Sequence, residues 1–197
     1  MLASQILALL GFATYAVALI AVQNEWGLSN FQSGLVASSF FLGYILVVPF
    51  ASSLSDRIDA KRIYLIGGFL SALGLFGFGC LANDLIQACM CMLINGAGFA
   101  SLYMPGLKII TDRLDAKVLS RPIAFYTAFF GVGTGFSYLI SGFLIPEWSW
   151  RTVFMAVSTG PVLSLLLVYF LVDDCFYPAQ KKVFVFSDVL PIDKWIE

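Results

Sequence analysis

Uncharged residues form six long runs along the chain, and the charged side chains gather between and after them. The runs cover residues 1–24, 26–55, 63–83, 85–107, 122–146 and 152–172, and each contains at least 21 residues. A helix needs about 20 predominantly apolar residues to cross a hydrocarbon core roughly 30 Å thick. Because that core offers the backbone no water, each segment must pair its own N–H and C=O groups, and the alternation typical of barrel strands is absent. The pattern predicts six transmembrane helices.

We predict an all-α integral membrane domain over residues 1–172, followed by a mixed polar tail over residues 173–197. The expected helices span about 3–23, 31–52, 62–82, 84–110, 122–145 and 151–172. Ser29 followed by Gln32 is typical of a capping box, in which each side chain pairs with a backbone N–H of the first turn. This pair should mark the start of the second helix.

Lysine and arginine are distributed unevenly between the two ends of the expected helices. One end has Arg57, Lys61, Arg62, Lys108, Arg113, Lys117 and Arg121, whereas the loops at the other end have only Arg151. Cytoplasmic loops of membrane proteins are enriched in these residues. The bias predicts that the basic loops and both termini are cytoplasmic in a multi-pass protein of the cell (inner) membrane. The tail would be a cytoplasmic extension or the start of a central loop between two domains.

The composition agrees with a membrane protein and narrows its chemistry. Of 197 residues, 60% are hydrophobic and 12% are charged, so the chain holds more apolar surface than one soluble core of this size can bury. The chain has no histidine, which removes imidazole bases and histidine metal ligands. The formal net charge of −1 gives no sign of a nucleic-acid partner. We expect a lipid bilayer as surroundings, and no catalytic activity, metal or cofactor.

Two nearly identical polar heptads interrupt the apolar pattern. SDRIDAK covers residues 55–61 and TDRLDAK covers residues 111–117, and both fall at the basic end. A bias toward bases explains the arginines and lysines but not the acid at Asp56. The first heptad therefore holds more than a topological signal.

The segment from Ser52 to Arg62, SSLSDRIDAKR, resembles the loop after the second helix of major facilitator superfamily transporters. Leu54, Ser55, Asp56, Arg57, Lys61 and Arg62 match the pattern of that loop, whereas Ser52 and Asp59 stand where the family usually has glycine. Three further segments are similar to the family in the same order: GLSNFQSGLVASSFFLGY (27–44), NGAGFASLYMPG (95–106) and WSWRTVF (148–154). The resemblance covers roughly residues 10–172, the N-terminal six-helix half.

The resemblance implies a half built as a three-plus-three inverted repeat, which works by alternating access around a site at mid-membrane. It also implies a cytoplasmic gate at the loop after the second helix. Asp56 would be the gate anion, facing a helix N-terminus of the second half, and Lys61 or Arg62 would reach Asp112. The implied gate residues are Asp56, Arg57, Lys61, Arg62, Asp112 and Arg113.

Uncharged polar residues near the middle of the spans are the candidates for a substrate cavity. They are Tyr15, Tyr44, Asn95, Tyr103, Tyr126 and Thr134. Asn95 stands out because a lone amide is costly in lipid unless it has a partner. A bond to a neighbouring helix explains it as well as a small-molecule substrate does.

Glycines recur at spacings that favour close helix packing, since small residues let backbones approach in a membrane. Gly131, Gly135 and Gly142 form one stripe on the fifth expected helix, and Gly96 and Gly98 lie on the fourth. We expect both sets to form packing seams.

A full family member has about twelve spans, so the resemblance implies a partner for this chain. The first interpretation is a half of a secondary transporter whose second six-helix half is elsewhere. The alternatives are a half-size transporter that works as a homodimer, and a membrane scaffold or assembly subunit that does not transport.

Overall fold

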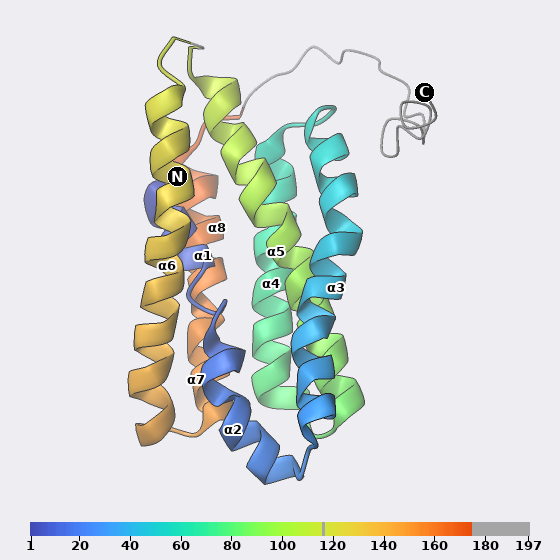
Figure 1. The fold of residues 1–197 in the computed structure, drawn as a ribbon. Helices are drawn as coiled ribbons and strands as arrows, with labels where there is room; N and C mark the ends of the chain where they lie inside the picture. The colour runs from blue at the N-terminus through green and yellow to red at the C-terminus, as the bar shows by residue number, and fades with distance from the viewer. Residues whose placement is uncertain (116, 175–197) are drawn as a thin grey trace, which may run out of the picture.

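The computed structural model describes residues 1–115 and 117–174, and every regular element among them is an α-helix. In chain order the helices are α1 (Leu2–Ala8), α2 (Thr14–Trp26), α3 (Asn30–Ser55), α4 (Ala60–Leu81), α5 (Leu85–Arg113), α6 (Ser120–Glu147), α7 (Trp150–Val157) and α8 (Thr159–Leu171). They form one elongated bundle, in which α3, α4 and α5 lie together and α1, α6 and α8 lie beside them (Figure 1). The predicted tail lies outside the described residues from position 175 onward.

Four of the described helices begin with a side-chain cap that the local sequence supplies: α3, α4, α5, and α7, where Ser149 accepts from the N–H of Arg151. Ser29 and Gln32 form the predicted capping box, with bonds of 3.2 and 2.9 Å between side chain and backbone. Asp59 accepts from the N–H of Lys61 at the start of α4, and Asp84 accepts from that of Gln87 at the start of α5. Because a side-chain acceptor satisfies N–H groups that have no partner inside the helix, Asp59 serves as a cap where the family usually has glycine.

Among the described residues, five helical segments are long and apolar enough to cross a membrane: α3, α4, α5, α6, and α7 with α8 as one segment, Trp150–Leu171. The prediction of one continuous helix over residues 3–23 is wrong, because the chain unwinds between α1 and α2 at residues 9–13. Whether this first segment spans therefore stays a prediction. The predicted helix over 151–172 is interrupted only at Ser158, where α7 meets α8.

A serine of α6 makes the break between α1 and α2 possible. The Ser137 hydroxyl donates to the carbonyl of Leu10 at 2.6 Å and accepts from the N–H of Ala13 at 3.0 Å. Beside it, the hydroxyls of Thr14 and Ser141 are 2.9 Å apart. Backbone groups freed inside a bilayer must be satisfied by such neighbours, so α6 replaces the helical bonds that the break removes.

The closest packing joins α3 and α4 to α5, and glycines of α5 form these seams as predicted. A Cβ added at Gly96 would meet the carbonyl oxygen of Phe40 on α3, and one added at Gly98 would meet the backbone nitrogen of Ser71 on α4. The second predicted seam is wrong for this bundle. Cβ atoms added at Gly131, Gly135 or Gly142 would meet nothing within 4 Å, because that stripe of α6 faces outward.

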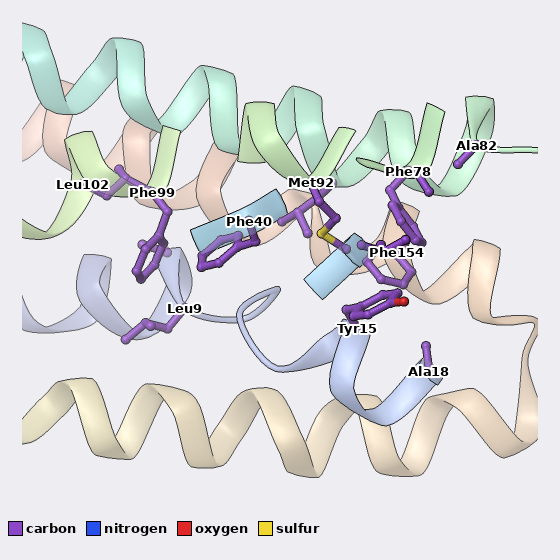
Figure 2. Packing of buried hydrophobic residues seen from close by; sticks show 14 of the residues in the cluster. Leu9, Tyr15, Ala18, Phe40, Phe78, Ala82, Met92, Phe99, Leu102 and Phe154 are labelled. Atoms are coloured by element: carbon purple, nitrogen blue, oxygen red, sulfur yellow. The ribbon is translucent and has the colours of Figure 1, made fainter. Parts of the chain in front are cut away.

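Aromatic rings fill the interior between the helix groups. Phe78 of α4 and Phe154 of α7 are fully buried, with ring centroids 4.4 Å apart, and Tyr15 of α2 packs edge-on against Phe78. Figure 2 shows this group at one end of the core, and Leu9, Phe40 and Phe99 near the unwound residues that join α1 to α2. The core therefore runs along the bundle and past the break.

The two ends of the bundle differ in chemistry, and we name them after it. The basic end carries the last residues of α3, α5 and α8 and the first of α4 and α6, with Asp56, Lys61 and Arg113. The tryptophan end carries Trp26, Trp148 and Trp150. By the distribution of lysine and arginine, the basic end is the one predicted to be cytoplasmic.

Arg151 joins three segments at the tryptophan end. Its guanidinium lies 4.5 Å from the ring centroid of Trp150 and 5.8 Å from that of Trp26, and it pairs with Glu25 at 3.3 Å. It also donates to the carbonyl of Ala82 at 2.7 Å. A planar guanidinium can stack on a ring with its face while its N–H groups donate from its edge, whereas a compact ammonium has no such face. Arg151 therefore fastens α7 to α2 and to the end of α4.

Replacing Arg151 with lysine is expected to lower the thermal midpoint of the purified chain by roughly 3 to 6 °C. The loss of the stacking and of one charged hydrogen bond amounts to about 1–2 kcal/mol, and each kcal/mol shifts the midpoint of a domain of this size by about 2–4 °C. Arg121→Lys is the control, since Arg121 is exposed and has no bonded partner among the described residues. Equal shifts in both variants would contradict the assigned role.

Candidate functional site

A lysine with two carboxylates lies at the basic end. The Nζ of Lys108 on α5 is 3.1 Å from Oδ1 of Asp56, at the end of α3, and 3.3 Å from Oδ1 of Asp112, one turn further along α5. The side chain of Asp112 is 8% exposed and that of Asp56 is 72% exposed. Lys108 therefore joins a buried acid to a solvent-exposed one.

A second ion pair ties the same loop to α5. Nη2 of Arg113 is 3.1 and 3.3 Å from the two carboxylate oxygens of Asp59, and it donates to the carbonyl of Asp173 at 2.8 Å. Lys61 pairs with Asp174 at 2.8 Å. The end of α8 is thus bonded both to α5 and to the start of α4.

These contacts place the predicted gate residues together but pair them differently. Asp56, Lys61, Asp112 and Arg113 all lie in this cluster, yet the expected bond from Lys61 or Arg62 to Asp112 is wrong. Arg57 lies half-buried in the turn after α3, and Arg62 is exposed on α4.

Sequence reasoning missed Lys108 as the cation of Asp112, although the four-residue spacing of 108 and 112 is the spacing that brings helical side chains together.

Two hollows lie at the middle of the bundle, and Phe12, Phe40 and Phe41 line both. The first, which we call the aromatic hollow, measures about 360 Å³ and is lined also by Tyr44, Phe99, Tyr103, Thr127 and Phe130. The second, the break hollow, measures about 150 Å³ and is lined also by Gly11, Ala13, Tyr15, Ala16, Ala37, Met92, Asn95 and Tyr138. No charged side chain lines either of them among the residues that the structure describes.

A larger hollow of about 920 Å³ lies at the basic end, between the ends of α5, α6 and α8. Asp173 and Asp174 form part of its rim, and the described chain stops there. The two hollows at mid-bundle are the candidates for a solute, because the family's solute site is expected at mid-membrane.

The structure places four of the six predicted cavity residues at the two hollows. Tyr44 and Tyr103 line the aromatic hollow, and Tyr15 and Asn95 line the break hollow.

The other two do not line either hollow. Tyr126 is fully buried, with its hydroxyl 3.4 Å from the carbonyl of Tyr103, and the Thr134 hydroxyl donates to the carbonyl of Phe130 on its own helix.

The phenylalanines that form most of the wall were not predicted. Phe12, Phe40, Phe99 and Phe130 are apolar, and a search for polar groups inside a membrane overlooks them. The ring centroid of Phe12 lies 5.2 Å from that of Phe99, 5.5 Å from that of Phe130 and 5.8 Å from that of Phe40. Ligand pockets are usually walled by such side chains and oriented by a few polar ones.

The bundle is that of a multi-pass membrane protein, and its fold matches solved membrane transporters. The structure of a proton:xylose symporter bound to a bromodeoxyglucose aligns with a TM-score of 0.75 at 17% identity, covering 85% of this chain and 43% of the symporter. The model of the Major Facilitator Superfamily matches residues 1–184. The chain belongs to this family.

Two curated relatives show how much of such a protein the chain represents. The multidrug resistance protein Stp of Mycobacterium tuberculosis is 27% identical over 167 residues, which are 84% of this chain and 31% of Stp. The gallate transporter of Pseudomonas putida is 25% identical over 167 residues, which are 83% of this chain and 37% of that transporter. The chain spans about a third of the length of each.

Proposed function

We propose that this chain forms the N-terminal half of a secondary transporter that moves a small solute across the cell membrane by alternating access. The observation that supports this most is the combination of an uncharged hollow at mid-bundle with an ion-pair cluster at one end. Alternating access requires a solute site near the midplane and contacts at the ends that can form and break.

A second six-helix half is the partner that completes the proposed transporter. The spanning windows of α3 and α6 are only 17% buried, whereas that of α4 is 61% buried. The outward glycine stripe of α6 lies on one of these little-covered helices, and small residues allow another helix to approach closely. The length of the relatives agrees, since the chain matches only 31–37% of them.

The cluster at the basic end is the proposed gate, with Asp56, Arg57, Lys61, Arg62, Asp112 and Arg113 as its predicted members and Lys108 added. The pair between Lys108 and Asp56, whose carboxylate is 72% exposed, contributes at most about 1 kcal/mol, as surface ion pairs do. Contacts of that size shift a two-state equilibrium without fixing it, as a gate that opens in every cycle requires. The gate would face the cytoplasm.

Site-directed crosslinking in membranes tests the proposed partner. In a variant without its native cysteines, Leu139→Cys places one thiol on the outward face of α6, where Leu139 is 58% exposed. When the gene is expressed at its own locus, we expect a product in which position 139 is joined to a peptide from outside residues 1–197. Phe170→Cys is the control on α8, where Phe170 is 74% exposed, and it should give little of this product.

The other outcomes select between the alternatives. A doubled band that contains only peptides of this chain would indicate a homodimeric half-size transporter. Equal labelling from positions 139 and 170, with no preferred partner, would contradict a specific second half and favour a scaffold.

A further inference from the structure

The first turn of α2 carries N–H groups that lie before the helical hydrogen-bond ladder. The ladder begins with the bond from the N–H of Val17 to the carbonyl of Ala13, so the N–H groups of Thr14, Tyr15 and Ala16 precede it, and no side chain caps them. The N–H of Ala13, just before them, is already bound to Ser137. The start of a helix carries partial positive charge from such unpaired N–H groups. Because Ala13, Tyr15 and Ala16 line the break hollow, this positive end lies at the hollow.

Asn95 provides a second, independent donor on the opposite wall. The residue is 4% exposed, and its Oδ1 accepts from the hydroxyl of Ser71 at 2.8 Å. Its Nδ2 has no partner in the described chain. Ser33 Oγ is the one fully enclosed side-chain polar atom there without a hydrogen bond, so Nδ2 must reach open space. The open space that Asn95 lines is the break hollow.

The break hollow offers the hydroxyl oxygens of Tyr15 and Tyr138 as acceptors, and neither is bonded to the N–H groups of α2 or to Asn95 in the described chain. The hydroxyl of Tyr15 donates to the carbonyl of Ser33 at 3.0 Å. An unpaired amide inside a membrane is costly, and a ligand oxygen between α2 and Asn95 would relieve both sets of donors. This position favours a hydrogen-bond acceptor on the ligand.

Aromatic rings determine the rest of the ligand. Phe12, at the break, lines both hollows, and its centroid is 5.2 Å from that of Phe99 and 5.5 Å from that of Phe130. Rings with centroids about 4.5–7 Å apart attract one another beyond simple burial. A flat ring therefore fits the aromatic hollow, directly beside the donors.

The charge of the ligand follows from the lining. A carboxylate here would find no cationic side chain on this chain, and burying an unpaired charge costs several kcal/mol or more, so about half a unit of charge at a helix start is not enough. An organic cation would be drawn to the rings but would face the positive end of α2. A neutral acceptor avoids both costs.

We propose that the transported solute is a neutral aromatic compound with a carbonyl-type oxygen, with the ring in the aromatic hollow and the oxygen between α2 and Asn95. This substrate class rests on the proposed function, because it identifies the solute of the same cavity. Binding does not require the second half or transport, so the two proposals fail separately.

Photolabelling of the full chain in lipid nanodiscs tests the site. Benzophenone is itself a neutral aromatic ketone, and on irradiation its oxygen takes the hydrogen of a nearby C–H group and its carbonyl carbon then bonds to that carbon. We expect adducts on peptides that contain Phe12, Phe40 or Met92. Acetophenone should compete at least tenfold better than ethylbenzene, which has nearly the same shape without the oxygen. Benzoate and phenyltrimethylammonium should compete no better than ethylbenzene.

Two variants separate ligand binding from packing. Asn95→Leu should reduce the preference for acetophenone at least threefold and still permit the adduct, because the rings remain. Ser71→Ala removes the same hydrogen bond between α4 and α5 but leaves the amide, so it should retain the preference.

Equal competition by acetophenone and ethylbenzene in the unmodified chain would overturn the proposal, as would stronger competition by the cation or the carboxylate. Equal loss in both variants would assign Asn95 to packing and also contradict it.

Discussion

Gly96→Ala is expected to lower the thermal midpoint of the chain by roughly 4 to 10 °C, one of the two largest effects we predict. The added methyl would overlap the carbonyl oxygen of Phe40. That oxygen belongs to the backbone of α3, so it cannot turn aside as a side chain would, and the helices must separate. Overpacking of this kind costs about 1–3 kcal/mol, and each kcal/mol is worth about 2–4 °C here. The midpoint is measured in nanodiscs by the increase in reactivity of the half-buried thiols of Cys89 and Cys91 on heating.

Gly135→Ala is the matched control for this substitution. A Cβ at Gly135 meets nothing within 4 Å, and alanine is the better helix former by roughly 1 kcal/mol. The midpoint of this variant should stay the same or rise slightly. If Gly96→Ala were as stable as Gly135→Ala, α3 and α5 would not pack as closely as described.

Lys108→Met is the second substitution with a large expected effect, a loss of about 2 kcal/mol in stability. Removing one partner of a buried ion pair leaves an uncompensated charge, which costs about 3–5 kcal/mol in full burial. Lys108 is 25% exposed, so the expected cost is smaller. The buried Asp112 accounts for most of it, because exposed pairs such as that with Asp56 contribute at most about 1 kcal/mol.

A double-mutant cycle checks this assignment. Asp112→Asn should restore at least half of the stability lost in Lys108→Met, since an amide can be buried at lower cost than a carboxylate without a cation. Lys117→Met makes the same change of charge on an exposed residue with no bonded partner in the described chain, and it should leave the midpoint unchanged. Failure of the rescue would show that Lys108 acts mainly through other contacts.

Features that depend on neighbouring residues could be predicted from the sequence. The length of the apolar runs gave five long helices with their approximate bounds, and Ser29 with Gln32 gave the start of α3. The order of four segments gave the family. Each apolar run and the capping pair lie within about thirty residues, where local hydrophobicity and capping decide the structure.

Features that depend on distant residues could not be predicted. The break between α1 and α2 requires Ser137, more than 120 positions further along the chain. The stripe of Gly131, Gly135 and Gly142 has the spacing of a packing seam, but spacing does not say which face of a helix turns inward. Buried in its place are Gly133, Ser137 and Ser141.

The candidate site contains some residues that could be predicted from local sequence and others whose placement depends on distant residues. Asn95 and the tyrosines could be found as polar residues in apolar runs, whereas the phenylalanine wall is formed only when α3, α5 and α6 meet at the break. The acids and bases of the basic end were found by type. Their pairing through Lys108 depends on how α5 is rotated against α3.

The break between α1 and α2 also constrains how the protein is made. Residues 9–13 leave the ribosome long before Ser137, whose hydroxyl pairs with Leu10 and Ala13. Ser137 lies 124 positions after Ala13. At about 5–20 residues per second, translation reaches it roughly 6 to 25 seconds later. Until then the C=O of Leu10 and the N–H of Ala13 must pair within the first segment, with water, or with the insertion machinery. Unpaired backbone groups are not tolerated in hydrocarbon. The first segment can thus take its final form only after the fifth long run has entered the membrane.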